Sequence, residues 1–157
     1  MRIGHSKDVH QLVKGRPLVL GGVIIDHPLG LAGHSDADVL THAVIESIIG
    51  ALGLGDIGTH FPDTDPRFKG ANSLDLLCST AQLLSSSGYQ VGNIDATIFA
   101  ETPKMKPYIS QMRSNLAKVL AVDVSQVNVK ATRGEKMGYI GRGEGMGAES
   151  VCLLMKI

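Results

Sequence analysis

Three side chains, two near the N-terminus and one further along, have the chemistry of a zinc site. Asp8 and His10 stand two positions apart, and His42 follows later in the chain. In an extended segment alternate side chains share a face, so Asp8 and His10 point the same way. With His42 they offer three ligands, the number that a catalytic zinc ion uses while it keeps one position open. The Asp8–His10 pair alone is weak evidence for a metal site, because a short Asp-x-His pair recurs by chance. His42 alone is also weak evidence, because most isolated helical histidines are only solvated or hydrogen-bonded.

The segment over residues 34–42 carries a helix start beside His42. Ser35 followed three residues later by Asp38 predicts a capping box, with Ser35 as the N-cap and a helix over residues 36–52. At 100° per residue, Ser35 and Asp38 lie within about 40° of His42 around the helix axis. A helix N-terminus favours bound anions, so we expect a phosphate group to bind close to the metal. The alternative is that Asp38 serves only as a capping residue.

The order of apolar patterns predicts strands and helices along the chain. The helix over residues 36–52 has an apolar stripe on the side away from His42, formed by Leu40, Ala43, Val44, Ser47, Ile48 and Ala51. Strands are expected over residues 1–13, 94–100, 127–131 and 151–155, and a hairpin with a Gly-Gly turn over residues 18–25. Further helices are expected over residues 72–88 and 107–120. This order predicts one α+β domain over residues 1–157, with helices packed on one face of a single-layer mixed β-sheet.

Composition excludes several classes of function. The 15 basic and 15 acidic residues give a formal net charge of zero, so the chain lacks the excess positive charge typical of proteins that bind nucleic acid or a membrane surface. The chain lacks the apolar N-terminal run of a signal peptide and any long apolar segment, and we expect a cytoplasmic location. Cys78 and Cys152 fall in a predicted helix and a predicted strand, and we expect both to be buried and reduced.

Two loops outside the helix start could also bind a ligand. Residues 55–70 are rich in turn formers, and Asp63 and Asp65 in this loop either bind sugar hydroxyls or a cation, or simply cap turns. Lys104, in the proline-containing loop over residues 100–107, either meets a phosphate or a base carbonyl or is an ordinary surface lysine. The glycines at 141, 143, 145 and 147 do not make a dinucleotide fingerprint, because their spacing differs and a strand follows them.

Several ordered motifs carry a resemblance that covers essentially the whole chain. They are Arg2-Ile3-Gly4-His5 with Asp8-Val9-His10; His34-Ser35-Asp36 through His42; Gly55-Asp56-Ile57-Gly58 with Phe61-Pro62-Asp63-Thr64-Asp65; Pro103-Lys104-Met105; Val127-Asn128-Val129-Lys130-Ala131-Thr132; Glu135-Lys136; and Gly141-Arg142-Gly143-Glu144-Gly145. In these residues and their spacing the sequence resembles the 2-C-methyl-D-erythritol 2,4-cyclodiphosphate synthase family of non-mevalonate isoprenoid biosynthesis. Several long matches in order are far more specific than any single motif.

The resemblance implies a reaction without a water nucleophile. Members of this family convert 4-diphosphocytidyl-2-C-methyl-D-erythritol 2-phosphate to the 2,4-cyclodiphosphate and CMP, because the 2-phosphate of the substrate attacks its own β-phosphorus. By resemblance, the zinc ligands are Asp8, His10 and His42. Glu135 is implied in holding a second divalent ion, magnesium or manganese, across the α and β phosphates.

The resemblance also implies catalytic and substrate-binding residues. The implied catalytic residues are His34, Arg133 and Glu135, with His34 placed to stabilise the transition state. The implied substrate contacts are Ser35; Asp56, Ile57 and Gly58; Phe61, Pro62, Asp63, Thr64 and Asp65; Ala100, Glu101, Thr102, Pro103, Lys104, Met105 and Lys106; Ala131, Thr132, Arg133, Gly134 and Glu135; and Tyr139 and Arg142. Residues 100–106 and 131–133 would form the cytidine end.

Three positions depart from the family pattern. Arg133 stands where the family usually has threonine, and its guanidinium could offer charge to a phosphate. Ser6 and Lys7 stand beside the metal ligands, where we expect a glycine and a large apolar residue.

The resemblance further implies a homotrimer with its sites between subunits. The strands would meet around a trimer axis, with Tyr139, Arg142 and Glu144 near a central cavity. The expected partner is the cytidine diphosphate substrate. Two other classes of function stay open: a metallohydrolase that uses water, and a non-catalytic trimer that binds a nucleotide or an isoprenoid diphosphate.

Overall fold

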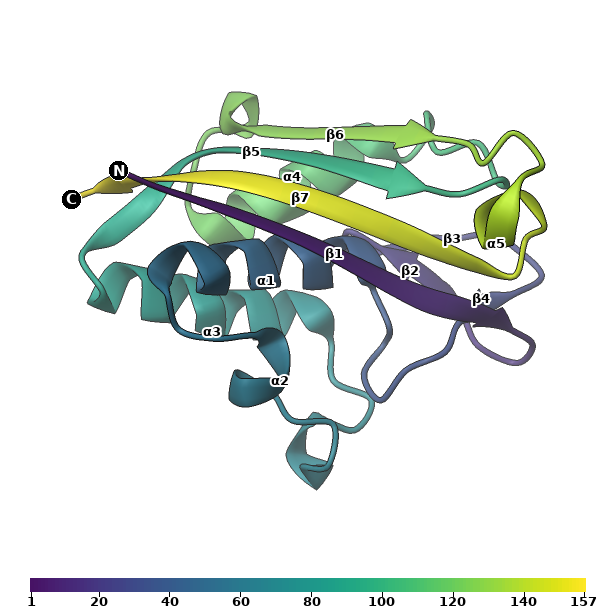
Figure 1. Ribbon diagram of the computed structural model, residues 1–157, viewed down its shortest axis with the longest axis horizontal. Coiled ribbons are helices and arrows are strands. Elements are labelled where there is room, and N and C mark those ends of the chain that lie inside the picture. Colours follow the sequence, from purple (N-terminus) through teal and green to yellow (C-terminus); the bar gives the residue numbers. More distant parts are fainter.

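The computed structural model describes residues 1–157 as one main β-sheet with helices on one side (Figure 1). The strand order is β4-β1-β7-β5-β6, and every pairing is antiparallel except that of β5 with β6. The strands are β1 (Arg2–Val13), β4 (Gly30–Leu31), β5 (Tyr89–Phe99), β6 (Val127–Thr132) and β7 (Gly145–Lys156). A separate hairpin pairs β2 (Leu18–Leu20) with β3 (Val23–Ile25). The predicted mixed sheet and the predicted hairpin are both confirmed.

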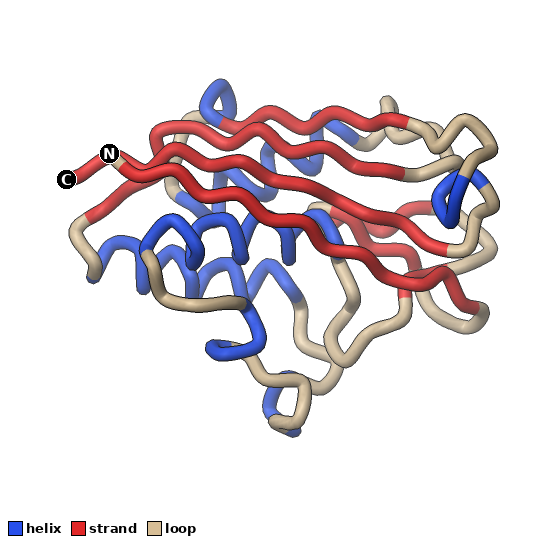
Figure 2. The backbone as a smooth tube through the Cα atoms, in the orientation of Figure 1, coloured by secondary structure: helices blue, strands red, loops and turns tan.

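The long helices lie together on one side of the strands (Figure 2). They are α1 (Val39–Leu52), α3 (Ser73–Ser86) and α4 (Ile109–Leu120), and the short helices are α2 (Ile57–His60), η1 (Pro66–Phe68), η2 (Val124–Gln126) and α5 (Gly138–Gly141). α1 packs directly on β1 and β7, while α3 packs against α1 and α4. One cluster of 33 buried hydrophobic residues joins these helices to the sheet, which confirms the α+β architecture. None of the helices has both the length and the apolar character needed to span a membrane.

The even-numbered residues of β1 face α1, and their sizes set how closely that helix approaches the strand. A Cβ added to Gly4 would lie 1.9 Å from a carbonyl oxygen of α1, so only glycine fits at this position. Ser6 is buried and donates a hydrogen bond to the Ala43 carbonyl oxygen at 2.6 Å. Further along the same face, Asp8 lies beside His42 of α1. Close packing of the helix on the strand therefore positions the candidate metal ligands, and the hydroxyl of Ser6 fits into that contact.

The start of α1 differs from the prediction. The helix begins at Val39 with Asp38 as its N-cap, so the predicted capping box with Ser35 as N-cap is wrong. Ala37 has a φ of 58°, which lies in the left-handed region and interrupts any helix there. The apolar stripe is confirmed, because its predicted members are all buried: Leu40, Ala43, Val44, Ser47, Ile48 and Ala51.

Asp38 ties the hairpin to the helix. Its buried carboxylate accepts hydrogen bonds from the backbone N–H groups of Gly21 and Gly22, at 2.9 and 2.8 Å, and from the N–H and hydroxyl of Thr41. Burial raises the pKa of the Asp38 carboxyl, and these hydrogen bonds oppose that rise. The predicted orientation of Asp38 alongside His42 is therefore wrong. Asp38 is the cap of α1, as the alternative predicts, but it also binds the turn of the hairpin.

Three further predictions need correction. Cys152 is buried as expected, but Cys78 is exposed because it lies on the solvent side of α3. α4 begins at Ile109, and Pro107 lies in the turn before it. The loop over residues 55–70 contains the short helices α2 and η1, each capped by an aspartate side chain.

The sheet face away from the three long helices carries large apolar side chains. Ile3 and Val9 of β1 are 71% and 49% exposed, and Val151 and Met155 of the neighbouring β7 are 45% and 40% exposed. A monomeric protein rarely exposes a large apolar patch, so this face has the character of an interaction surface.

Candidate metal centre and neighbouring cavities

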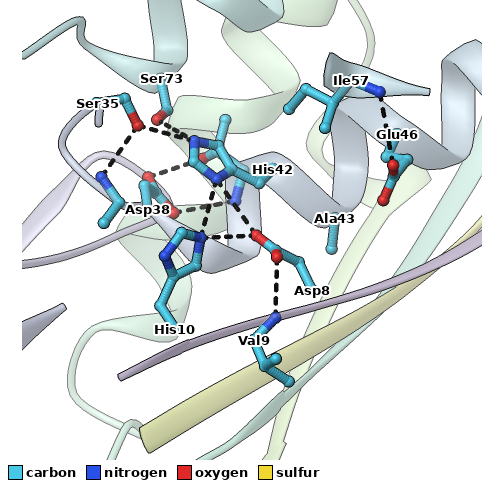
Figure 3. A network of polar contacts seen from close by, with 12 residues as sticks. Asp8, Val9, His10, Ser35, Asp38, His42, Ala43, Glu46, Ile57 and Ser73 are labelled. Atoms are coloured by element: carbon cyan, nitrogen blue, oxygen red, sulfur yellow. Dashed lines mark hydrogen bonds and ion pairs between the residues drawn. The ribbon is translucent and has the colours of Figure 1, made fainter. Parts of the chain in front are cut away.

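Asp8 and His10 of β1 and His42 of α1 point toward one another (Figure 3). The Asp8 Oδ2 atom lies 2.9 Å from His10 Nε2 and 3.2 Å from His42 Nδ1, and these two nitrogens are 3.3 Å apart. They form the one group of three or more potential metal-ligating side chains in the chain, with ligand atoms within 4.8 Å of one another. The structure therefore brings together the three residues that the sequence suggests as zinc ligands.

The hydrogen bonds of His10 show why a cation suits this cluster. His10 Nδ1 lies 2.6 Å from the Ala32 carbonyl oxygen, which can only accept, so Nδ1 carries the proton of the neutral ring. The bare Nε2 then faces the Asp8 carboxylate, which also can only accept. Two acceptors at this separation need a proton or a metal ion between them. One carboxylate and two imidazoles are ligands that zinc prefers.

Protons compete with a metal for these ligands. Burial disfavours the charged form of Asp8, but the hydrogen bonds and charges of His10 and His42 outweigh it and hold the Asp8 pKa well below its usual range. Burial also lowers the pKa of His10, but the Asp8 carboxylate outweighs burial, so the His10 pKa is raised above its ordinary value. Asp8 is therefore ionised at neutral pH, and a proton on His10 Nε2 competes with a metal ion for the same nitrogen.

A cavity of about 410 Å³, which we call the metal cavity, opens beside the cluster. Its lining residues are Asp8, His10, Gly33, His34, Ser35, His42, Ile57, Gly58, Phe61, Pro62, Asp63, Phe68 and Leu76. The sequence suggests all of these as site residues except Gly33, Phe68 and Leu76. The cavity thus joins the candidate metal ligands to His34 and Ser35, where the sequence predicts a phosphate site, and to the loop over residues 55–70.

Three predicted contacts near this cavity do not line it: Asp56, Thr64 and Asp65. Asp56 caps α2 and Asp65 caps η1 through side-chain hydrogen bonds. The backbone oxygen of Asp65 also lies 3.1 Å from His34 Nε2. The turn-capping alternative therefore describes Asp65, while Asp63 lines the cavity.

A second cavity, of about 660 Å³, lies at the loops that follow β5 and β6, and we call it the cationic cavity. It is lined by Ala100, Pro103, Lys104, Met105, Lys106, Ile109, Ser110, Arg113, Ala131, Thr132 and Arg133. Four of these residues are basic and none is acidic, which favours a ligand that carries negative charge. The sequence does not suggest Ile109, Ser110 or Arg113 as site residues, because their pattern predicts only an ordinary amphipathic helix. The cationic cavity and the metal cavity share no lining residue.

Four other predicted contacts lie beside the cationic cavity without lining it. The Glu101 carboxylate accepts a hydrogen bond from the Gly134 backbone N–H at 3.0 Å, which joins the loops after β5 and β6. The Thr102 hydroxyl lies 3.4 Å from the ring of His27. Glu135 is exposed and has a φ of 52°.

The remaining predicted contacts lie near a third cavity, of about 390 Å³. Tyr139 lines it together with His10 and Glu144, and Arg142 forms an ion pair with Glu144 at 2.8 Å. Within one chain, the predicted substrate residues are thus distributed over three cavities.

Two residues that contact the site were not suggested by the sequence. The Arg16 guanidinium donates to the carbonyl oxygens of Gly33 and Ser35, at 2.8 and 2.6 Å, and so holds the backbone on both sides of His34. Ser73, the first residue of α3, places its Oγ 2.9 Å from His42 Nε2. No motif marks either residue, because each contact depends on how distant elements pack.

Comparison with known proteins shows which family this chain belongs to. The YgbB family profile matches residues 1–155. The chain belongs to the YgbB family. It is 58% identical over 156 residues to a 2-C-methyl-D-erythritol 2,4-cyclodiphosphate synthase of Syntrophotalea carbinolica, covering 99% of this chain and 95% of that protein. It is 57% identical over 155 residues to the enzyme of the same name from Geobacillus kaustophilus, covering 99% and 98%.

Solved structures show the same fold as this YgbB-family chain. The bifunctional IspDF from Campylobacter jejuni superposes with a TM-score of 0.95 at 45% identity, over 99% of this chain. Our chain spans 42% of that longer protein. IspF of Plasmodium falciparum, in a complex with CDP, superposes with a TM-score of 0.87 at 34% identity, covering 99% of this chain and 96% of that one.

Proposed function

We propose that this chain converts 4-diphosphocytidyl-2-C-methyl-D-erythritol 2-phosphate to 2-C-methyl-D-erythritol 2,4-cyclodiphosphate and CMP, as a phosphorus–oxygen lyase of isoprenoid precursor biosynthesis. The observation that carries the proposal is the convergence of Asp8, His10 and His42 beside the His34–Ser35 loop. Relatives of more than half identity over nearly the whole chain bear the name of this synthase.

The chain's own residues would position the phosphates and neutralise their charge. A zinc ion held by the cluster would polarise and orient a phosphate oxygen. His34 and Ser35, which line the metal cavity, would bind the phosphate on its other side. In the reaction an oxygen of the 2-phosphate bonds to the β-phosphorus, and the bond from that phosphorus to the bridging oxygen breaks, so CMP leaves with that oxygen. Because the nucleophile belongs to the substrate, holding it in a folded conformation supplies much of the rate.

The cationic cavity would take the cytidine end of the substrate, with Lys104, Lys106 and Arg133 near its phosphates. Glu135 would hold the second divalent ion, magnesium or manganese. It is a single carboxylate on an exposed loop, so phosphate oxygens and water would supply the other ligands, as is usual for magnesium.

We infer a homotrimer with the strands around its axis, as the family resemblance implies. Two observations support it: the apolar sheet face exposes Ile3, Val9 and Val151, and the metal and cationic cavities share no residue within one chain. A site built between subunits would let the cationic cavity of one protomer meet the metal cavity of its neighbour. Light scattering on the purified protein tests this, and a monomer would contradict it.

Turnover with the cytidyl substrate tests the proposed reaction directly. Purified protein supplied with zinc and magnesium should release CMP and a cyclic diphosphate, which phosphorus NMR distinguishes from a linear product. The assay should be run in ¹⁸O-labelled water. A cyclic product without label supports the proposal, whereas a labelled linear diphosphate would make the protein a metallohydrolase. Binding of CDP without any turnover would instead indicate the non-catalytic trimer.

A further inference from the structure

His42 is contacted on its outer nitrogen as well as on the nitrogen that faces the candidate metal site. His42 Nδ1 faces Asp8 and His10, while Nε2 lies 2.9 Å from Ser73 Oγ and 3.1 Å from Ser35 Oγ (Figure 3). Ser73 is fully buried at the start of α3 and does not line the metal cavity, whereas Ser35 does. The two hydroxyls therefore have different access to a ligand.

A carboxylate on the far side of Ser73 fixes the direction of this hydrogen bond. Asp36 accepts from the Ser73 backbone N–H at 3.0 Å and also from the Ser73 hydroxyl. A carboxylate has no proton to give, so the Ser73 hydroxyl proton is committed to Asp36. Toward His42, Ser73 Oγ can then only accept. His42 Nε2 must carry the ring proton, which leaves Nδ1 bare and directed at Asp8 and His10.

We propose that Ser73, held by Asp36, is a positioning residue that fixes the tautomer and the orientation of His42 for a divalent cation. Metal-binding histidines commonly donate their second N–H to such a partner, which sets the ring orientation and increases its basicity as a ligand. The cation in this proposal rests on the proposed function, whereas the tautomer of His42 rests on the hydrogen bonds of the chain alone.

The same geometry separates the role of Ser35 from that of Ser73. One imidazole N–H makes one strong hydrogen bond, and Ser73 is both the nearer acceptor and the one polarised by a carboxylate. Ser35 Oγ accepts from the backbone N–H of Ala37 at 3.1 Å, which leaves its own proton uncommitted. In the metal cavity this proton is free to bind a phosphate oxygen.

The first test measures the tautomer in the metal-free protein by nitrogen-15 NMR of the histidine rings. The expected result is that His42 carries its proton on Nε2 in the wild-type protein. A neutral ring with its proton on Nδ1 and a bare Nε2 would overturn the proposal, whatever the variants show. Because this measurement needs neither zinc nor substrate, it stands apart from the success or failure of the proposed function.

The second test measures zinc affinity against a competing chromophoric chelator. Ser73→Ala should raise the zinc dissociation constant by about 10- to 100-fold, and Ser73→Thr, which keeps the hydroxyl, should recover most of that loss. Thr80→Val is the matched control, because Thr80 is a second buried hydroxyl on α3 that bonds only to the Leu76 carbonyl oxygen. We expect this control to change zinc affinity by less than about twofold. Wild-type affinity in Ser73→Ala, or an equal loss in the control, would overturn the proposal.

The third test separates the two serines. Ser35→Ala should leave zinc affinity within about twofold of wild type and raise the KM for the cytidyl substrate, while Ser73→Ala lowers zinc affinity before any substrate is added. If Ser35→Ala lost zinc as readily as Ser73→Ala, Ser35 would be the partner of His42 and the assignment would fail. If the wild-type protein had no synthase activity while Ser73→Ala still weakened zinc binding, only the proposed function would be contradicted.

Discussion

The metal cavity and the cationic cavity are organised in opposite ways. In the metal cavity each candidate ligand has a second contact: His10 with the Ala32 carbonyl oxygen, His42 with Ser73, and Asp8 with the backbone N–H of Val9. In the cationic cavity the basic side chains are Lys104, Lys106, Arg113 and Arg133, and only Arg113 forms a hydrogen bond within the chain.

This difference indicates when the side chains of each cavity lose conformational entropy: during folding in the metal cavity, and during ligand binding in the cationic cavity. The metal ligands are ordered by the fold itself, so an ion can bind without rearranging them. The lysines and Arg133 lose side-chain freedom only when a ligand arrives, and that loss subtracts from the binding free energy. We therefore expect the metal cavity to bind its ion whether or not the nucleotide is present. The cationic cavity should contribute mainly to substrate affinity.

Removal of a metal ligand should give the largest effect. His42→Ala should lose bound zinc and lower kcat/KM more than about a thousandfold, because the polarising cation and its fixed position disappear together. Treatment of the wild-type protein with a chelator should have the same effect, and added zinc should restore turnover. His60→Ala is the control, since His60 lies on α2 outside the cavity lining. Metal analysis beside steady-state kinetics checks this, and normal turnover by zinc-free protein would contradict it.

Loss of a cation from the cationic cavity should have a smaller effect that spares the metal. Lys104→Ala and Arg133→Ala should each raise the KM for the cytidyl substrate by about 10- to 100-fold, the value of one charge-assisted hydrogen bond. Zinc affinity should not change, because neither residue lines the metal cavity. Lys118→Ala, an exposed lysine later on α4, is the matched control. A fall in zinc affinity in either variant would show that the two cavities are not independent.

Acidification should weaken zinc binding in the metal cavity. The His10 pKa is raised in the metal-free protein, so protons displace zinc as the pH falls through that value, and we expect the zinc dissociation constant to rise by about tenfold per pH unit below it. Activity should therefore already be lower at about pH 6 than at neutral pH, and it should fall further below that. Retention of both zinc and rate at pH 5 would contradict the assignment.

The stability of the metal-free protein should change with pH in the opposite direction to zinc binding. A histidine whose pKa is raised by folding stabilises the fold fully below its unfolded value of about 6.5, and this contribution is lost as the pH rises through the folded value. Asp8, whose pKa is lowered, adds stability that is lost only in strong acid. Thermal unfolding at several pH values, with and without zinc, measures both trends.

The sequence predicts the fold well because its signals are local and agree with one another. Alternation along β1 places Asp8 and His10 on one face, and the apolar stripe of α1 identifies the buried side of the helix that carries His42. The meeting of the two elements could not be derived from spacing. It depends on Gly4 and Ser6, which allow α1 to lie against β1.

The errors arise where two local interpretations are equally good and a distant contact decides between them. Ser35 and Asp38 are both good capping residues, and Asp38 is the cap because its carboxylate also binds the Gly21–Gly22 turn. Ser73 follows the capping residue Asn72 and gives no sign in the sequence that it meets His42. The cytoplasmic location and the extent of a single domain over residues 1–157 stay predictions.

The smallest expected effect is that of salt, and it distinguishes the two cavities without any mutation. Raising ionic strength from 0.05 to 0.5 M shortens the screening length from well above to well below about 10 Å, which weakens attraction between exposed charges. The KM for the cytidyl substrate should rise by about threefold, because Lys104, Lys106 and Arg133 act as free charges at the rim of their cavity. Zinc affinity should change less, because two of its three ligands are neutral imidazoles and all three are partly buried. A larger salt effect on zinc than on substrate would mean that the metal cavity, and not the cationic one, depends on mobile surface charge.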